Sequence, residues 1–176
     1  MSKPTGVLFL SKPNQIIVAS GDDGTLKILS GDDFQVLQNL TGLADADNLR
    51  YDASAKKVYV GYGSGAIGAI DVTSLQRKSP VKLKGHPESF QLEKIGTNIY
   101  VNVPAAKEIA IIDRSTMSLL SSWSLDRFSA NFPMSLDEKG RRLFIGTRQP
   151  PRVLIQDIVS GKPIIGFQRD LDALPF

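Results

Sequence analysis

One pattern recurs four times along the 176-residue chain and limits its possible folds more than any other feature. In three copies an apolar residue is followed by an acid, five turn-forming or basic residues and an apolar triplet, and the remaining copy matches with one residue fewer. The copies are Leu10–Val18, Tyr51–Val60, Leu92–Val101 and Leu136–Ile145. Successive copies start 41, 41 and 44 residues apart, and a fifth begins at Phe176, 40 residues further on. A regular period of about 40 residues indicates a repeat architecture.

Within each copy the hydrophobic period is two, which is typical of strands. A β-branched or aromatic run such as Val58–Gly61 is followed by a Gly or Pro turn and a second run such as Ile67–Ile70. The second run ends on an acid in three copies, at Asp71, Asp113 and Asp157. A last short run follows, for example Pro163–Ile165. Each copy therefore predicts about four short antiparallel strands.

A 40-residue unit of four strands predicts a blade of a β-propeller. One blade cannot bury both of its faces, so the blades must stack on one another. We expect a single all-β domain over residues 1–176, with four blades at about 4–42, 43–84, 85–128 and 129–171 and the start of a fifth at 172–176. A β-sandwich, the other common all-β arrangement, does not require this period.

The runs Val58–Gly61 and Ile99–Asn102, each leading to a strand that ends Ile-Asp, resemble the YVTN-repeat β-propellers. The resemblance extends from Gly6 to Phe176, and the segments before the second, third and fourth copies are similar to an exported bacterial branch of that family. The WD-repeat class is different, because this chain lacks a Gly-His…Trp-Asp pattern. Members of the YVTN family close rings of about seven blades and are often periplasmic or secreted. The resemblance thus implies that these four repeats form an open arc of a larger ring, which would self-associate through exposed blade faces. A closed four-bladed ring is the alternative.

Composition excludes several classes of function. The chain has no Cys and one His, so Cys-ligated zinc, disulfides, a CxxCH haem site and a multi-histidine metal centre are ruled out. The 21 basic and 18 acidic residues are spread evenly, and no aromatic residues alternate with the basic clusters, which argues against a nucleic-acid partner. No apolar run is long enough for a membrane span or for the core of a signal peptide. These features therefore do not assign the protein to a cellular compartment.

Loops that join consecutive blades are the candidate binding site, because in a propeller they reach the mouth of the central channel. They contain the only histidine and several carboxylates and amides. The candidate residues are Asp45, Asp47, Asn48, His86, Glu88, Asn131, Asp170 and Asp172. Converging oxygens suit Ca²⁺, a polyhydroxylated ligand or a cationic ligand. Equally, Asp and Asn are common in loops because their side chains stabilise turns.

No catalytic pattern is evident. Gly63–Gly68 fits GxGxxG, but the dinucleotide motif needs a helix after the glycines and here a strand is predicted, so we expect a hairpin turn. The sequence favours a non-enzymatic binding or scaffold module that presents its mouth loops to a small ligand or a protein partner. The alternative is a divalent-cation-dependent hydrolase, such as a lactonase, with His86 as its base.

Overall fold

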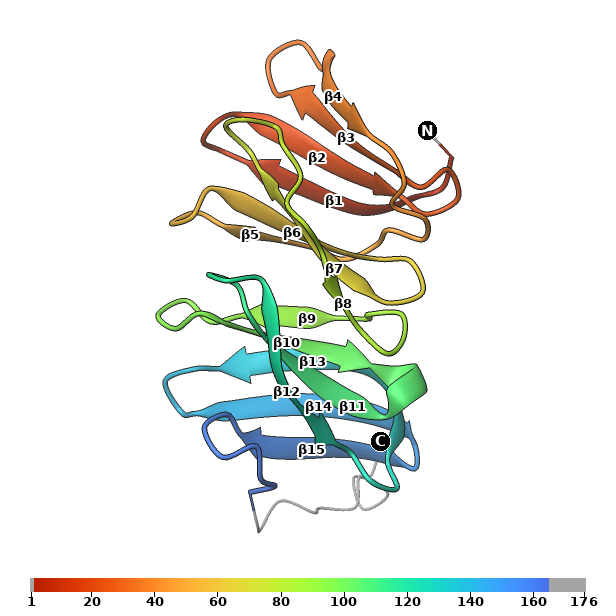
Figure 1. Ribbon diagram of the computed structural model, residues 1–176, viewed down its shortest axis with the longest axis vertical. Helices are drawn as coiled ribbons and strands as arrows, with labels where there is room; N and C mark the ends of the chain where they lie inside the picture. The colour runs from red at the N-terminus through yellow and green to blue at the C-terminus, as the bar shows by residue number, and fades with distance from the viewer. Residues whose placement is uncertain (1, 165–176) are drawn as a thin grey trace, which may run out of the picture. The chain divides into compact units, whose positions relative to one another are not determined.

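The computed structural model describes residues 2–164, and every regular element there is a strand apart from one short 3-10 turn, η1 (Pro104–Ala106) (Figure 1). Within this range no helix has the length and apolar character needed to cross a membrane. The strands form four antiparallel sheets, and each sheet is built from one copy of the repeat. The prediction of an all-β fold with one sheet per copy is therefore confirmed.

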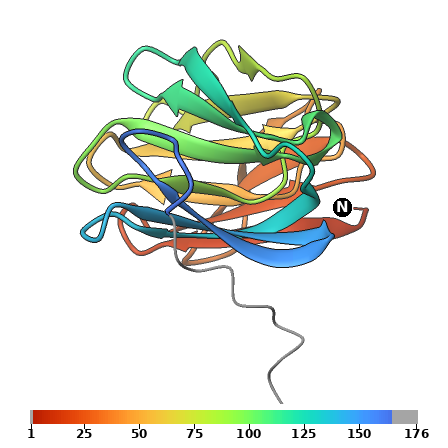
Figure 2. The same cartoon turned by 90° about the horizontal axis from the view of Figure 1, so that it is seen from below.

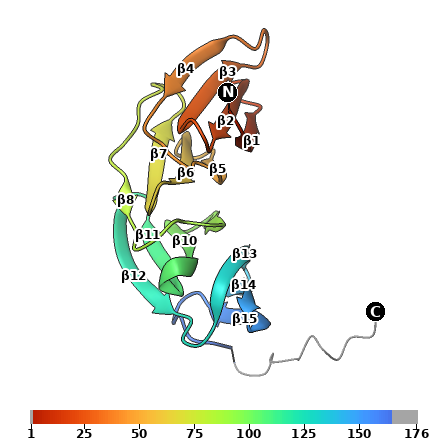
Figure 3. The same cartoon turned by 90° about the vertical axis from the view of Figure 1, so that its right-hand side faces the viewer.

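Strands lie in chain order within each sheet, as Figure 3 shows for β1 to β4. The first sheet consists of β1 (Pro4–Leu10), β2 (Gln15–Ser20), β3 (Thr25–Ser30) and β4 (Val36–Leu40). The second consists of β5 (Leu49–Asp52), β6 (Lys57–Tyr62), β7 (Ala66–Asp71) and β8 (Val81–Lys82). The third consists of β9 (Phe90–Leu92), β10 (Asn98–Val103), β11 (Glu108–Asp113) and β12 (Ser118–Ser124). The fourth consists of β13 (Ser129–Asp137), β14 (Arg142–Gln149) and β15 (Pro151–Asp157).

The predicted last strand of the fourth copy, Pro163–Ile165, is only partly described. Pro163 forms an isolated bridge with Gln156, and the Ile164 amide donates to the Ile155 carbonyl over 2.9 Å. Ile165 and the start of a fifth blade at 172–176 lie outside the described residues. The described sheet twists visibly (blue in Figure 2), as antiparallel sheets do.

The chain divides into two compact units, Met1–Pro87 (unit 1) and Glu88–Phe176 (unit 2). Unit 1 contains the first and second sheets, which pack face to face over a fully buried core. Its centre includes Ile17 and Ile28 from the first sheet and Val58, Val60 and Ile70 from the second. Burying such aliphatic side chains contributes about 1.5–3 kcal/mol each, so packing of one sheet on the next stabilises the unit.

Unit 2 repeats this arrangement with the third and fourth sheets. Tyr100, Ile109 and Ile111 of the third sheet pack against Leu143 and Ile145 of the fourth. In both units, residues of one strand alternate between the two faces of their sheet, which is why period-two runs in the sequence become stacked sheets.

Strand pairing corrects the predicted alignment of the first copy. Residues that face each other across the first hairpin of each sheet are Phe9 and Ile16, Tyr51 and Val58, Leu92 and Ile99, and Leu136 and Leu143. The first copy therefore begins at Phe9 and has the same length as the others, so the prediction that it is one residue shorter is wrong. Leu10 was matched to Tyr51 because both are apolar, but Leu10 occupies the position of the acid and points to the opposite face.

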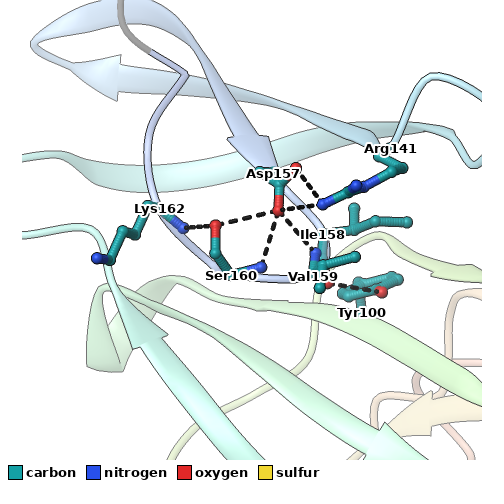
Figure 4. Close-up of polar contacts among 7 residues, drawn as sticks. All are labelled: Tyr100, Arg141, Asp157, Ile158, Val159, Ser160 and Lys162. Atoms are coloured by element: carbon teal, nitrogen blue, oxygen red, sulfur yellow. Dashed lines mark hydrogen bonds and ion pairs between the residues drawn. The ribbon is translucent and has the colours of Figure 1, made fainter.

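Acids at the end of the third strand hold the turn that follows. The Asp157 carboxylate accepts hydrogen bonds from the amides of Val159 and Ser160 and from the Ser160 hydroxyl, and it pairs with Arg141 over 3.1 Å (Figure 4). Asp71 and Asp113 make the same kind of turn in their sheets. The recurrent aspartates of the sequence are thus structural.

The GxGxxG segment forms a hairpin, as predicted. Gly63 and Gly65 lie in the turn between β6 and β7, both with positive φ, and Ile67 and Gly68 belong to β7. A side chain at Gly65 would also collide with the Leu83 carbonyl, since its Cβ would lie 2.5 Å from that oxygen. Glycine is therefore required here by the backbone, without any nucleotide.

Candidate functional site

His86 is the centre of a polar cluster beside the β6–β7 turn, and that turn lies at the right-hand end of unit 1 in Figure 1. It follows β8 and lies against the β6–β7 turn, where its Nδ1 is 2.7 Å from the Gly63 carbonyl oxygen. Because a carbonyl oxygen only accepts, Nδ1 must carry a hydrogen. The imidazole is one quarter exposed, so a polar partner in solvent can reach it.

Two carboxylates from the loop between β4 and β5 flank the ring. Asp45 Oδ2 lies 3.6 Å from Nδ1, and Asp47 Oδ2 lies 3.7 Å from Nε2. Asp45 is 70% exposed, whereas Asp47 is 25% exposed. We call Asp45, Asp47 and His86 the mouth cluster. These three loop residues lie close together at one end of the strands of unit 1.

Backbone hydrogen bonds fix the loop that carries the two aspartates. Asp45 has a φ of 53° and its amide donates to the Gly21 carbonyl over 3.0 Å. The Asp47 amide donates to the Gly61 carbonyl over 3.2 Å, and its carboxylate accepts from the Asn48 amide. One carboxylate oxygen of Asp47 thus stabilises its own loop while the other faces His86.

More charged groups surround the mouth cluster. Asp22 and Asp23 occupy the β2–β3 turn next to Asp45, and Lys3 pairs with Asp22 over 3.6 Å. Hydrogen bonds from the hydroxyls of Thr25 and Ser20 lower the pKa of Asp23, so it stays ionised. Burial lowers the pKa of Arg50, and the charge of Asp47 opposes that shift. This end of unit 1 therefore presents four carboxylates.

The geometry does not suit His86 as a general base. With Nδ1–H donated to Gly63, the neutral ring would turn the lone pair of Nε2 toward the Asp47 carboxylate, which is also an acceptor. Nε2 therefore faces a carboxylate 3.7 Å away and not an open position for a substrate proton.

A metal centre is not evident in the part of the chain that the structure describes. Residues 2–164 contain no group of three or more His, Asp or Glu side chains arranged to hold a metal ion. Asp45 and Asp47 lie on two sides of an imidazole, whereas Ca²⁺ needs six to eight oxygens at about 2.3–2.6 Å from one point. Calcium binding would require both aspartates to turn away from His86.

The other candidate residues are placed differently. Asn48 is half-buried, and its carbonyl accepts from the Gly61 amide over 3.1 Å. Glu88 belongs to unit 2, where its amide donates to the Asn102 carbonyl over 3.0 Å. Asp170 and Asp172 lie outside the described residues.

Asn131 lies in the interior of unit 2, with no exposed surface. Its amide nitrogen donates to Asn102 Oδ1 over 3.0 Å and to the Glu108 carbonyl over 3.3 Å. Its side-chain oxygen has no hydrogen-bond partner among the described residues. These bonds give Asn131 a structural role between β10, β11 and β13.

Sequence reasoning missed three contributors to this end of unit 1. The Gly63 carbonyl orients His86, and no side-chain pattern signals a backbone acceptor. Asp22 and Asp23 are not among the predicted site residues, although the antiparallel topology places the β2–β3 turn at the same end as the loop after β4. That topological rule could have identified them.

Comparison with known proteins supports the fold and not a function. No protein-family model matches the chain, and no curated protein matches it. Among solved structures, 1082 chains match. One is a chain of Kuenenia stuttgartiensis hydrazine synthase, with a TM-score of 0.81 at 15% identity; the match covers 93% of this chain and 48% of that chain. The chain therefore spans about half the length of that hydrazine synthase chain.

Similarity at this level of identity establishes the fold alone. The four sheets are each built from one copy of the repeat. Together with this structural similarity, they define an all-β protein with β-propeller-like blades. So many structural matches mean that the fold is widely used, and a widely used fold does not assign a function.

Proposed function

We propose that the protein is a non-enzymatic binding module whose mouth cluster takes a cationic group of a ligand or protein partner. The observation that carries the proposal is the position of Asp45. Its carboxylate is 70% exposed, and it lies next to Asp47 on one side and the β2–β3 turn on the other. An ammonium or guanidinium group bound there would interact with several carboxylates at once.

We further propose that the sheets are blades of a YVTN-type ring of about seven blades, as the sequence resemblance implies. Support comes from the first sheet, whose face away from the second sheet carries exposed apolar side chains, including Val7 (68% exposed) and Phe9 (58%). The match to only 48% of the hydrazine synthase chain is compatible with a longer relative of this architecture.

Calorimetric titration with a pentalysine peptide at low ionic strength tests the binding proposal. We expect the peptide to bind wild-type protein, and the D45N/D47N variant to bind at least about tenfold more weakly, since two charges are removed from one site. The control is D126N, because Asp126 is also an exposed loop aspartate with a φ of 53°. No binding by wild-type protein, or an equal loss with D126N, would contradict the proposal.

A cation-dependent hydrolase at the same mouth is the alternative, and it has its own test. A lactonase of this kind would bind Ca²⁺ or Zn²⁺ and lose activity on substitution of Asp47 or Glu88. Calorimetry that detects neither ion bound to the intact protein excludes it. Substrate turnover that disappears in D47N would instead overturn the non-enzymatic proposal.

A further inference from the structure

Unit 1 has a cleft at the end opposite the mouth cluster. The β1–β2 turn of the first sheet and the β5–β6 and β7–β8 turns of the second sheet meet there, on the left in Figure 1. The cleft has a volume of about 490 Å³, which lies within the ~300–1,000 Å³ of small-molecule sites. It is therefore large enough for an organic ligand.

The walls of the cleft combine an apolar floor with two cations. Val72 and Tyr51 line the cleft from the second sheet, where Val72 is buried and Tyr51 is half-buried. Lys12 comes from the first sheet and Lys56 from the second, and both are exposed. Neither ammonium group has a carboxylate within ion-pair distance in residues 2–164.

Two acids at this end of the second sheet accept hydrogen bonds within their own turns. Asp52 Oδ1 accepts hydrogen bonds from the amides of Ser54 and Ala55 and from the Ser54 hydroxyl. Asp71 Oδ1 accepts from the amides of Thr73 and Ser74, and these bonds lower its pKa.

Hydroxyl groups complete the lining. Ser11 and Thr73 face the cleft from the two sheets, and the Tyr51 hydroxyl lies 3.4 Å from the Lys12 carbonyl. A flat apolar body can pack on Tyr51 and Val72 while its anionic group binds the ammonium groups.

We propose that this cleft binds a small aromatic anion, with Lys12 and Lys56 holding its phosphate or carboxylate and Tyr51 packing against its ring. The site involves different residues from the mouth cluster, so it is independent of the proposed function. A ligand here would touch both sheets of unit 1 and stabilise their packing.

Calorimetric titration with phenyl phosphate and benzoate tests the proposal. We expect at least one probe to bind in a 1:1 ratio, with phenol and inorganic phosphate each about tenfold weaker because they supply only one half of the interaction. The K12Q/K56Q variant should lose at least about tenfold in affinity, and raising the salt should weaken the wild-type interaction.

The matched control is K107Q. Lys107 lies in unit 2 and is exposed, with a φ of 51° that is close to the 52° of Lys56. Circular dichroism checks that each variant is folded. Absence of binding by both aromatic anions, unchanged affinity in K12Q/K56Q, or an equal loss in K107Q would overturn the proposal. If D45N/D47N loses pentalysine binding and still binds phenyl phosphate, the two sites are distinct.

Discussion

At the scale of single residues, Tyr100 stabilises unit 2 through both its ring and its hydroxyl. Its ring is fully buried in unit 2 and its hydroxyl donates to Glu93 Oε1 over 2.7 Å. Burial and the hydrogen bond to Glu93 raise the pKa of the phenol, so Tyr100 remains neutral and acts as a donor. The other Glu93 oxygen accepts from the Asn98 amide over 3.0 Å. One carboxylate thus joins the loop after β9 to a core side chain.

We predict that Tyr100→Phe destabilises the protein by about 1–3 kcal/mol, the usual cost when a hydrogen bond to a charged buried partner is lost. Urea denaturation followed by circular dichroism measures this change. The control is Tyr62→Phe, since the Tyr62 hydroxyl has no hydrogen-bond partner in the described part of the chain. If both variants lose the same stability, the account of Tyr100 is wrong.

At the scale of strands and turns, the aspartates that end the third strands act as a repeated device. Hydrogen bonds from turn amides and hydroxyls lower the pKa of Asp71, Asp113 and Asp157. In the first sheet Ser30 takes this position, and its hydroxyl accepts from the amides of Asp32 and Asp33. Three of the four turns therefore depend on an ionised carboxylate.

These pKa shifts predict a loss of stability in acid. A carboxyl group whose pKa is lower in the folded state stabilises the fold above its unfolded pKa, near 3.8, and that stabilisation disappears as the pH falls through the folded value. We expect the urea midpoint of wild-type protein to fall between about pH 5 and pH 2. The triple variant D71N/D113N/D157N should be less stable at pH 7 and show a smaller decline. If the urea midpoint of the triple variant falls with pH as much as that of wild-type protein, the three aspartates do not have this role.

The sequence predicted the elements well because the repeat imposes them four times. The strand runs, the hairpin at Gly63 and the copy-by-copy sheets follow from period-two alternation and turn residues. The register of the first hairpin was missed, because Leu10 is apolar where the other copies have an acid. Pattern matching could not determine which face Leu10 occupies.

The site was predictable only in part. Topology brings Asp45, Asp47 and His86 to one end of unit 1, as the loop argument required. It did not reveal that His86 bonds to a backbone carbonyl or that Asn131 is fully buried. Both facts depend on side-chain packing and not on loop position.

At the scale of the whole molecule, the first sheet has an apolar outward face, which is the face turned away from the second sheet. This face affects how the protein assembles. Phe9, Ile16, Leu29 and Val36 lie opposite one another across β1 to β4, so they share that face. Their counterparts in the second sheet, such as Val58 and Ile70, are buried against the first sheet. The apolar face of the first sheet is thus equivalent to the face by which the second sheet packs on the first.

We predict that the protein self-associates through this face, and that Phe9→Lys shifts it toward monomer. Light scattering coupled to gel filtration, over a series of concentrations, measures the mass. Phe34→Lys is the control, because Phe34 is 64% exposed but lies in the β3–β4 turn. Wild-type protein that stays monomeric at all concentrations would count against an open blade face.

Each sheet is formed by strand pairing within one copy of the repeat, and interstrand backbone NOEs measured by NMR test this pairing most directly. We expect NOEs across the first hairpin of each sheet, between Phe9 and Ile16, Tyr51 and Val58, Leu92 and Ile99, and Leu136 and Leu143. Backbone NOEs that place Leu10 opposite Ile16, or that join strands of two different copies into one ladder, would contradict it.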